Sequence, residues 1–281
     1  MQVSLLQCQS SRKPPENLAF IAQQLAQLPR AADEPQLVVL PECSLLFGGH
    51  EGEQLALSST EGADSLFAHL AALAKKYHVY LAGGTIPVTS GDGRVYSRSI
   101  LFDDQGSELG SYDKLHLFDV DVSDNTGAYR ESDTFCAGER ISVVPTPFGH
   151  LGMTVCYDLR FADLFRALRL QGAELIIVPA AFTKVTGAAH WEVLLRARAI
   201  ETQCYILAAA QWGAHNEGGR QTWGQSMIVD PWGKIVAQLP EGTGWVQAKL
   251  DKQLLAKVRQ DMPVCQHNRF AAPQLLATPR K

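Results

Sequence analysis

The chain has 281 residues, of which 46% are hydrophobic and 19% are charged, with 25 Lys and Arg residues against 29 Asp and Glu residues. This much apolar material with a net charge of only −4 excludes a disordered chain. The scattered basic residues argue against nucleic acid as a partner. No apolar run approaches the roughly 18 to 20 residues that a membrane helix needs, so no membrane association is expected.

One domain is expected over residues 1–281, with a core over 1–270 and a loose tail over 271–281. No Gly-, Ser- or Pro-rich linker marks a boundary, and α/β domains of this size are common. The first residues lack the basic-then-apolar order of a secretory signal. The six cysteines form no Cys-x-x-Cys pair and are too sparse for a disulfide scaffold. The cysteine pattern therefore favours a reducing, cytoplasmic compartment.

The first half of the chain alternates short β-like runs with helical periodicity, which predicts an α/β fold. In chain order, the pattern predicts a strand, a helix, a strand, a helix, a strand and then adjacent antiparallel strands. These elements are expected at residues 3–7, 17–28, 36–40, 63–77, 79–83, 95–102 and 108–112.

Residues 114–140 are rich in Asp, Ser and Gly without a clear period, which predicts a long functional connection. Order then resumes, and the second half repeats the sequence of element types seen in the first. We therefore expect an internally pseudo-symmetric layered domain without a detectable sequence repeat. Strands are expected at 142–145, 151–155, 175–178, 205–210, 226–229, 234–238 and 245–248, and helices at 161–170 and 190–202.

Three reactive side chains follow predicted strands. Cys156 ends an apolar run just before a helical segment, a turn that can expose a nucleophile, although a buried structural cysteine is the alternative. Glu42 follows a strand and is costly to bury without a partner or an acid–base role; a solvated carboxylate is the alternative. Lys114 also follows a predicted strand; a solvent-exposed surface lysine is the alternative. Because all three lie at strand ends, we predict one composite site.

The segments around these residues match a family as a set. They are Leu-Pro-Glu-Cys at 40–43, Tyr-Asp-Lys-Leu-His-Leu-Phe at 112–118 and Val-Cys-Tyr-Asp-Leu-Arg-Phe at 155–161. In this order they resemble the carbon-nitrogen hydrolase, or nitrilase, superfamily. Further matches at 187–191, 196–201, 230–233 and 263–264 extend the resemblance over essentially the whole chain. The resemblance implies a four-layer αββα sandwich and a homodimer.

The same resemblance implies a role for each motif residue. Glu42 is the general base and acid, Cys156 the nucleophile and Lys114 the oxyanion stabiliser, together with the backbone N–H of Tyr157. Glu131 matches a second glutamate of the family that supports the lysine. Four neighbouring acids compete for this last assignment: Asp119, Asp121, Asp124 and Asp133.

Other Cys and His residues have simpler interpretations. No papain- or caspase-like signature surrounds Cys156, so His116, His150 and His190 are interpreted as structural. Cys43, beside the predicted base, is interpreted as a packing residue. The His, Cys, Asp and Glu spacings lack a zinc signature, and we expect neither a metal nor a cofactor.

Three residues are candidates for substrate binding. Arg160 lies one turn beyond the predicted nucleophile and could pair with a substrate carboxylate; an ion pair with Asp158 or Asp163 is the alternative. Phe182 and Thr183 follow a predicted strand end and are candidate pocket residues, although a core aromatic explains Phe182 equally well.

Within the superfamily, Cys-Tyr-Asp-x-Arg-Phe resembles the branch that cleaves amides of dicarboxylic keto acids. Residues 190–205 and 208–211 are more similar to deaminated-glutathione amidases than to omega-amidases, and 44–49 lack the Pro-Tyr-Gly typical of omega-amidases. The resemblance implies hydrolysis of deaminated glutathione to 2-oxoglutarate and cysteinylglycine through a cysteine thioester. The alternatives are an omega-amidase acting on 2-oxoglutaramate or succinamate, another amide, carbamoyl or nitrile hydrolase, or an inactive binding scaffold of the same fold.

Overall fold

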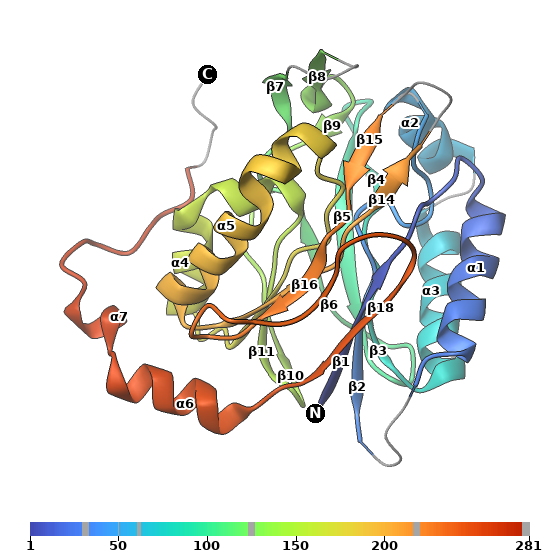
Figure 1. Ribbon diagram of the computed structural model, residues 1–281. Helices are drawn as coiled ribbons and strands as arrows, with labels where there is room; N and C mark the ends of the chain where they lie inside the picture. Colours follow the sequence, from blue (N-terminus) through green and yellow to red (C-terminus); the bar gives the residue numbers. More distant parts are fainter. Residues whose placement is uncertain (30–33, 50, 61–62, 123–126, 216–219, 277–281) are drawn as a thin grey trace.

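The computed structural model describes residues 1–29, 34–49, 51–60, 63–122, 127–215 and 220–276. Two β-sheets pack face to face, and helices cover the outer face of each (Figure 1). The αββα layering expected from the sequence is therefore confirmed. None of the helices in these ranges combines the length and apolarity needed to cross a membrane.

The first sheet comes mainly from the N-terminal half. Its central strands β1, β2 and β3 run parallel, and β5 lies antiparallel to β3. Strand β18 returns from the far end of the chain and pairs antiparallel with β1. The strands are β1 (Gln2–Gln7), β2 (Gln36–Val39), β3 (Tyr80–Ala82), β4 (Ile86–Thr89), β5 (Val95–Phe102), β6 (Glu108–Asp113), β9 (Phe135–Cys136) and β18 (Gly244–Lys249).

The second sheet repeats this plan. Strands β11, β12 and β13 run parallel, with β10 antiparallel on one side and β16 antiparallel on the other. Strand β10 thus occupies the position that β18 holds in the first sheet, which gives the fold its pseudo-symmetry. The strands are β10 (Val143–Thr146), β11 (Gly149–Met153), β12 (Leu175–Ile177), β13 (Tyr205–Ala208), β16 (Ser226–Val229) and β17 (Ile235–Leu239).

Alternating side chains build two cores. In β2, Leu37 and Val39 face the second sheet, whereas Val38 packs with the helices outside. A strand that is buried on both faces has apolar residues at successive positions, which explains the continuous apolar sequence of β2. Helices α1 (Pro14–Ala26) and α3 (Ala63–Tyr77) cover the first sheet, and α4 (Ala162–Leu170) and α5 (Lys184–Thr202) cover the second (Figure 1).

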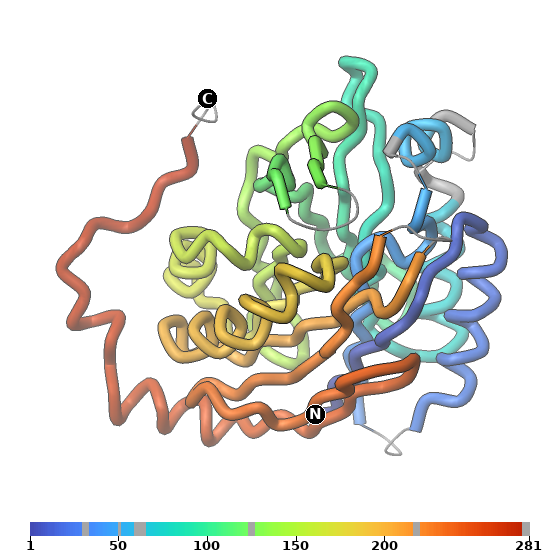
Figure 2. Tube along the Cα trace, turned by 45° about the horizontal axis from the view of Figure 1, so that its top comes forward, coloured from blue at the N-terminus to red at the C-terminus, as the bar shows by residue number. Residues whose placement is uncertain are grey.

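The C-terminal segment leaves the sandwich. Beyond β18, α6 (Lys252–Asp261) and α7 (Val264–His267) pass outside the layer of α4 and α5 (Figures 1 and 2). Arg166 of α4 donates hydrogen bonds to Asn268 Oδ1 and to the Phe270 carbonyl, at 3.1 and 2.7 Å. The described part of the predicted tail, 271–276, is mostly exposed, and 277–281 lie outside the described residues.

Several elements differ from the sequence-based expectations. Helix α5 begins at Lys184, earlier than the predicted start at residue 190. The sequence pattern missed these first turns because they contain Gly187 and lack an apolar stripe. A Cβ at Gly187 would lie 2.3 Å from Cβ of Trp223, so strand packing requires this glycine. Elements without a clear periodic signal were not predicted: α2 (Glu51–Thr60), α6, α7, β4, β7 (Asp119–Asp121), β8 (Ala128–Arg130), β9, β14 (Trp212–Ala214) and β15 (Gln221–Trp223).

Candidate active site

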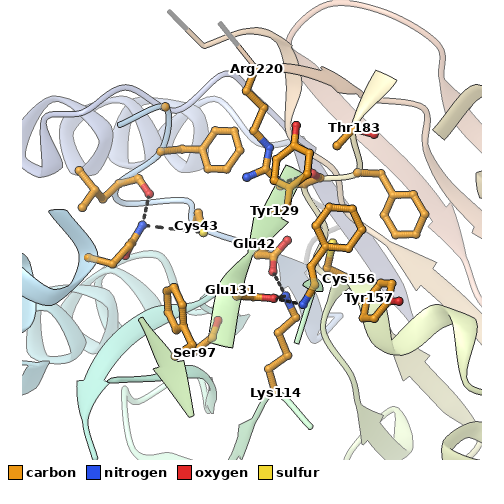
Figure 3. Close-up of a pocket in the computed structure, with 18 of the residues that line it drawn as sticks. Glu42, Cys43, Ser97, Lys114, Tyr129, Glu131, Cys156, Tyr157, Thr183 and Arg220 are labelled. Carbon is orange, nitrogen blue, oxygen red and sulfur yellow. Dashed lines mark hydrogen bonds and ion pairs between the residues drawn. The ribbon is translucent and has the colours of Figure 1, made fainter. Parts of the chain in front are cut away.

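Four of the sequence-predicted residues meet in one pocket (Figure 3). Nζ of Lys114 lies 2.9 Å from Oε1 of Glu42 and 2.8 and 2.9 Å from the two carboxylate oxygens of Glu131. Cys156 lines the same pocket. All four side chains are buried, so these charges interact in an environment that excludes most water.

Each of these residues occupies the end of a β-strand or a short turn. Glu42 follows β2, and Lys114 directly follows β6, where its N–H donates to the Ser97 carbonyl at 3.0 Å. Cys156 follows β11 and begins the 3-10 helix η2 (Cys156–Arg160). Glu131 begins a second 3-10 helix, η1 (Glu131–Asp133). The two sheets therefore contribute to one site at their shared edge.

The backbone at Cys156 is strained. Its φ of 49° lies in the left-handed region, which non-glycine residues rarely adopt. The N–H of Cys156 donates to the Pro179 carbonyl at 2.8 Å, which fixes the turn against the neighbouring strand end. This sharp turn directs the thiol into the pocket, as the sequence predicted for a strand-to-helix turn.

The carboxylate of Asp158 stabilises this turn by accepting hydrogen bonds. It is fully buried, and its Oδ2 accepts hydrogen bonds from the N–H of Val155 and the hydroxyl of Tyr112, both at 2.8 Å. Its Oδ1 accepts from the N–H of His116 at 3.1 Å and lies 2.7 Å from His116 Nδ1. The imidazole also stacks on Phe161, with ring centroids 3.6 Å apart. One carboxylate thus links the lysine strand to the cysteine turn.

We expect Asp158→Asn to destabilise the fold by about 3 kcal/mol, because an amide nitrogen cannot accept the hydrogen bonds that one carboxylate oxygen now receives. Urea denaturation followed by circular dichroism measures the change. The matched control is Asp163→Asn, a solvent-exposed carboxylate in the first turn of α4, for which little change is expected. Equal stability of the two variants would contradict the role assigned to Asp158.

Burial and charge determine the protonation states at the centre of the pocket. Burial by itself would lower the pKa of Lys114, but the carboxylates of Glu131 and Glu42 raise the pKa well above its usual value. The pKa of the Cys156 thiol is also raised, first by burial and then by the charge of Glu42, while Lys114 opposes the shift. The thiol is therefore protonated at neutral pH, and a base must accept its proton before sulfur can attack.

A sequence profile of the carbon-nitrogen hydrolase family matches residues 2–260. The chain belongs to this family. It is 49% identical over 96% of its length to a deaminated glutathione amidase from Yersinia enterocolitica, 93% of which is covered. The solved structure of Saccharomyces cerevisiae Nit3, described as a member of branch 10 of the nitrilase superfamily, is 32% identical with a TM-score of 0.82, and coverage is 96% of this chain and 97% of that one.

The Caenorhabditis elegans NitFhit structure is also similar, with a TM-score of 0.86 and 36% identity over 95% of this chain. This chain covers 65% of that longer protein. The superfamily predicted from the motifs is confirmed, and so is the nitrilase-type fold.

The wall of this hydrolase's pocket contains the remaining predicted residues. The guanidinium of Arg160 lies 5.1 Å from the ring centroid of Phe182 and 5.7 Å from that of Tyr157. Its Nη1 lies 3.1 Å from Nδ1 of His190, and neither Asp158 nor Asp163 is its ion-pair partner among the described residues. The guanidinium is thus positioned at the pocket rather than neutralised by a neighbouring carboxylate.

Phe182 and Thr183 have structural contacts in addition to lining the pocket. The ring of Phe182 packs against Trp191, with centroids 4.9 Å apart, so both interpretations of this residue hold. Thr183 is the N-cap of α5, and its Oγ1 accepts from the N–H of Thr186 at 3.3 Å. The N–H of Tyr157 is near the start of η2, where helical N–H groups lack an intrahelical acceptor and can bind a ligand oxygen.

The histidines and the competing acids lie elsewhere. Within the described chain, none of the pocket-lining residues is a histidine: His116 contacts Asp158, His190 contacts Arg160, and His150 is exposed near Glu174. Three of the competing acids are exposed: Asp119, Asp121 and Asp133. The fourth, Asp124, lies outside the described residues. No cluster of three or more metal-binding side chains occurs in the described ranges.

Sequence reasoning missed several pocket residues. Arg220, Phe47 and Tyr129 line the pocket, but the sequence predicted no role for any of them. Cys43 also lines it, and burial raises its pKa to about 12. The N–H of Cys43 donates to the Thr85 hydroxyl at 2.9 Å, and the same hydroxyl lies 3.9 Å from the Cys43 sulfur.

Proposed function

We propose that this carbon-nitrogen hydrolase is an amidase that converts deaminated glutathione to 2-oxoglutarate and cysteinylglycine. The observation that carries the proposal is the buried lysine held between two carboxylates in the pocket that the Cys156 thiol also lines. Amide hydrolysis requires a nucleophile, a base and an oxyanion site, and this cluster supplies all three. The similarity to a deaminated glutathione amidase along nearly the whole chain supports the substrate.

The first half-reaction forms a thioester. Glu42 takes the thiol proton of Cys156, and the sulfur attacks the amide carbon of the substrate. Protonation of Glu42 removes its negative charge and so weakens its hydrogen bond with the ammonium of Lys114. One N–H of Lys114 is then free to bind the developing oxyanion together with the N–H of Tyr157. Glu131 keeps the ammonium in place through both of its oxygens. The C–N bond then breaks, and Glu42 returns the proton to the departing amine.

The second half-reaction releases the acid. Glu42 removes a proton from a water molecule, the hydroxide attacks the thioester carbon, and the C–S bond breaks. The thiolate recovers the proton from Glu42, which restores the starting state of Cys156. The carboxylate of the acyl group pairs with Arg160, whose guanidinium reaches the pocket beside Phe182 and Thr183.

A direct comparison of substrates tests the proposed function. We expect kcat/KM for deaminated glutathione to exceed that for 2-oxoglutaramate at least about tenfold, because the longer substrate makes more contacts. Release of 2-oxoglutarate is measured with a coupled dehydrogenase assay. Faster hydrolysis of 2-oxoglutaramate would assign an omega-amidase instead, and turnover of neither compound would reject both assignments.

We also propose a cytoplasmic homodimer. The sparse unpaired cysteines fit a reducing compartment. Val193 and Ile200 are exposed two turns apart on α5, and the exposed Trp232 precedes Gly233, which packs against Ile200. An apolar strip of this kind on one helix fits burial by a second copy of the chain. Sedimentation velocity measures the expected dimer; a monomer at micromolar concentration would contradict it.

A further inference from the structure

Arg220 is a third cation in the pocket, after Lys114 and Arg160, and the mechanism above does not use it (Figure 3). It directly precedes β15, and in Figure 3 its side chain enters the pocket at the end away from Lys114. Its guanidinium carbon lies 4.9 Å from the ring centroid of Phe47 and 5.0 Å from that of Tyr129. Its Nη2 donates to the Ala181 carbonyl at 3.2 Å, so the side chain is held in one orientation.

The hydrogen-bonding capacity of Arg220 is incompletely used. Its Nε is buried and has no hydrogen-bond partner among the described residues. Within the same residues, the guanidinium has no carboxylate ion-pair partner; Glu53, the acidic residue at this end of the pocket, pairs with Arg12 instead. A buried donor without an acceptor is costly, whereas a fixed guanidinium that meets a carboxylate can form two parallel hydrogen bonds.

The aromatic residue that supports Arg220 is itself held in place by contacts with the hairpin that carries the arginine. The Phe47 ring meets His215 edge to face, with centroids 4.3 Å apart. Nε2 of His215 lies 2.7 Å from the hydroxyl of Thr222, two residues beyond Arg220 in the β14–β15 hairpin. These contacts connect the aromatic support to the strand that carries the arginine. A guanidinium that is oriented before binding loses less side-chain entropy when it binds an anion.

The two pocket arginines differ in their relation to the nucleophile. Arg160 belongs to the same 3-10 helix as Cys156, and the mechanism above assigns it the carboxylate of the acyl group. Arg220 comes from a different hairpin and is supported by Phe47 and Tyr129. Deaminated glutathione also has two carboxylates, one on the acyl group, at the other end of its carbon chain from the reacting carbon, and one at the far end of the dipeptide.

We propose that Arg220 binds the terminal carboxylate of the departing dipeptide, while Arg160 binds the carboxylate of the acyl group. This inference rests on the proposed function and extends it, because it names the residue that distinguishes a peptide-like amide from a small one. Small amides such as 2-oxoglutaramate have no group for Arg220 to bind. The residue therefore acts in specificity rather than in the chemical steps.

Three substrates and three variants test the assignment. The substrates are deaminated glutathione, its analogue with a terminal glycinamide, and 2-oxoglutaramate. We expect Arg220→Gln to lower kcat/KM for deaminated glutathione by about 10- to 100-fold, the value of a charge-assisted pair, with a much smaller loss for the two compounds without the terminal carboxylate. Arg220→Lys should give an intermediate loss, because lysine keeps the positive charge but lacks the planar guanidinium that donates two parallel hydrogen bonds. Arg160→Gln should lower kcat/KM for all three.

The outcomes separate the inference from the function on which it rests. An equal loss for all three substrates in Arg220→Gln, or no loss for any, would overturn the assignment of Arg220. If the wild-type protein does not hydrolyse deaminated glutathione, the proposed function fails and the inference fails with it, before any variant is examined. Unchanged thermal unfolding of Arg220→Lys shows that the effects arise from binding rather than from a disturbed fold.

Discussion

Cys156→Ala is expected to lower kcat for deaminated glutathione by about 10⁴-fold or more, because it removes the sulfur that forms the thioester in the proposed mechanism. The fold should persist. The side chain is small, and the strained turn is held by backbone and carboxylate contacts, the Cys156 N–H to the Pro179 carbonyl and the Val155 N–H to Asp158. The rate is measured from 2-oxoglutarate release, and the fold by circular dichroism.

The pocket contains its own control for this experiment. Cys43 is half-buried, lines the same pocket and has a positive φ of 55°. Because it has no part in the proposed mechanism, Cys43→Ala should retain turnover within about tenfold of the wild-type protein. Mass spectrometry of the wild-type protein quenched during turnover should locate the acyl group on Cys156. Hydrolysis that survives in Cys156→Ala, or an acyl group on Cys43, would reject the assigned nucleophile.

The convergence of the central residues was predictable because the sequence marks strand ends well. Leu37, Val38 and Val39 form a continuous apolar run, which identifies a strand buried on both faces. Polar groups placed just after such strands gather at one edge of a sheet. Glu42 and Lys114 follow this rule within the first sheet, and Cys156 follows it within the second. Their spatial meeting therefore needed only the layered fold and the order of the strands.

Glu131 and Arg220 were harder to find because long-range contacts place them. Glu131 lies between short strands in a segment without periodicity, and its position depends on Lys114 and on the N–H of Phe118, which donates to it at 2.6 Å. The family resemblance pointed to Glu131, whereas local sequence could not distinguish it from its acidic neighbours. Arg220 belongs to no motif, and the role proposed for it rests on rings that approach it from distant parts of the chain.

Lys114→Met is expected to affect both stability and catalysis. The substitution leaves Glu42 and Glu131 buried next to each other without the cation that now contacts both. Removal of one partner from a buried ion pair costs about 3 to 5 kcal/mol, and loss of an oxyanion donor lowers kcat by about 100-fold or more. Urea denaturation and steady-state kinetics measure the two effects.

The stability loss of Lys114→Met should depend on pH. In the folded protein, burial and the charge of Glu42 raise the pKa of Glu131, and Lys114 opposes them. Without the lysine, the folded-state pKa of Glu131 rises further above its unfolded value. Protonation then removes the repulsion, so the stability deficit should be largest near neutral pH and should shrink as the pH falls toward the unfolded value of about 4.3.

A second substitution separates the electrostatic effect from the catalytic one. Adding Glu131→Gln to Lys114→Met removes one of the two unpaired carboxylates, so much of the lost stability at neutral pH should return. Catalysis should not return, because the oxyanion still lacks the ammonium of Lys114. If the double variant regained kcat along with stability, the lysine would serve only to neutralise the glutamates. Stabilisation without activity instead assigns Lys114 to the transition state.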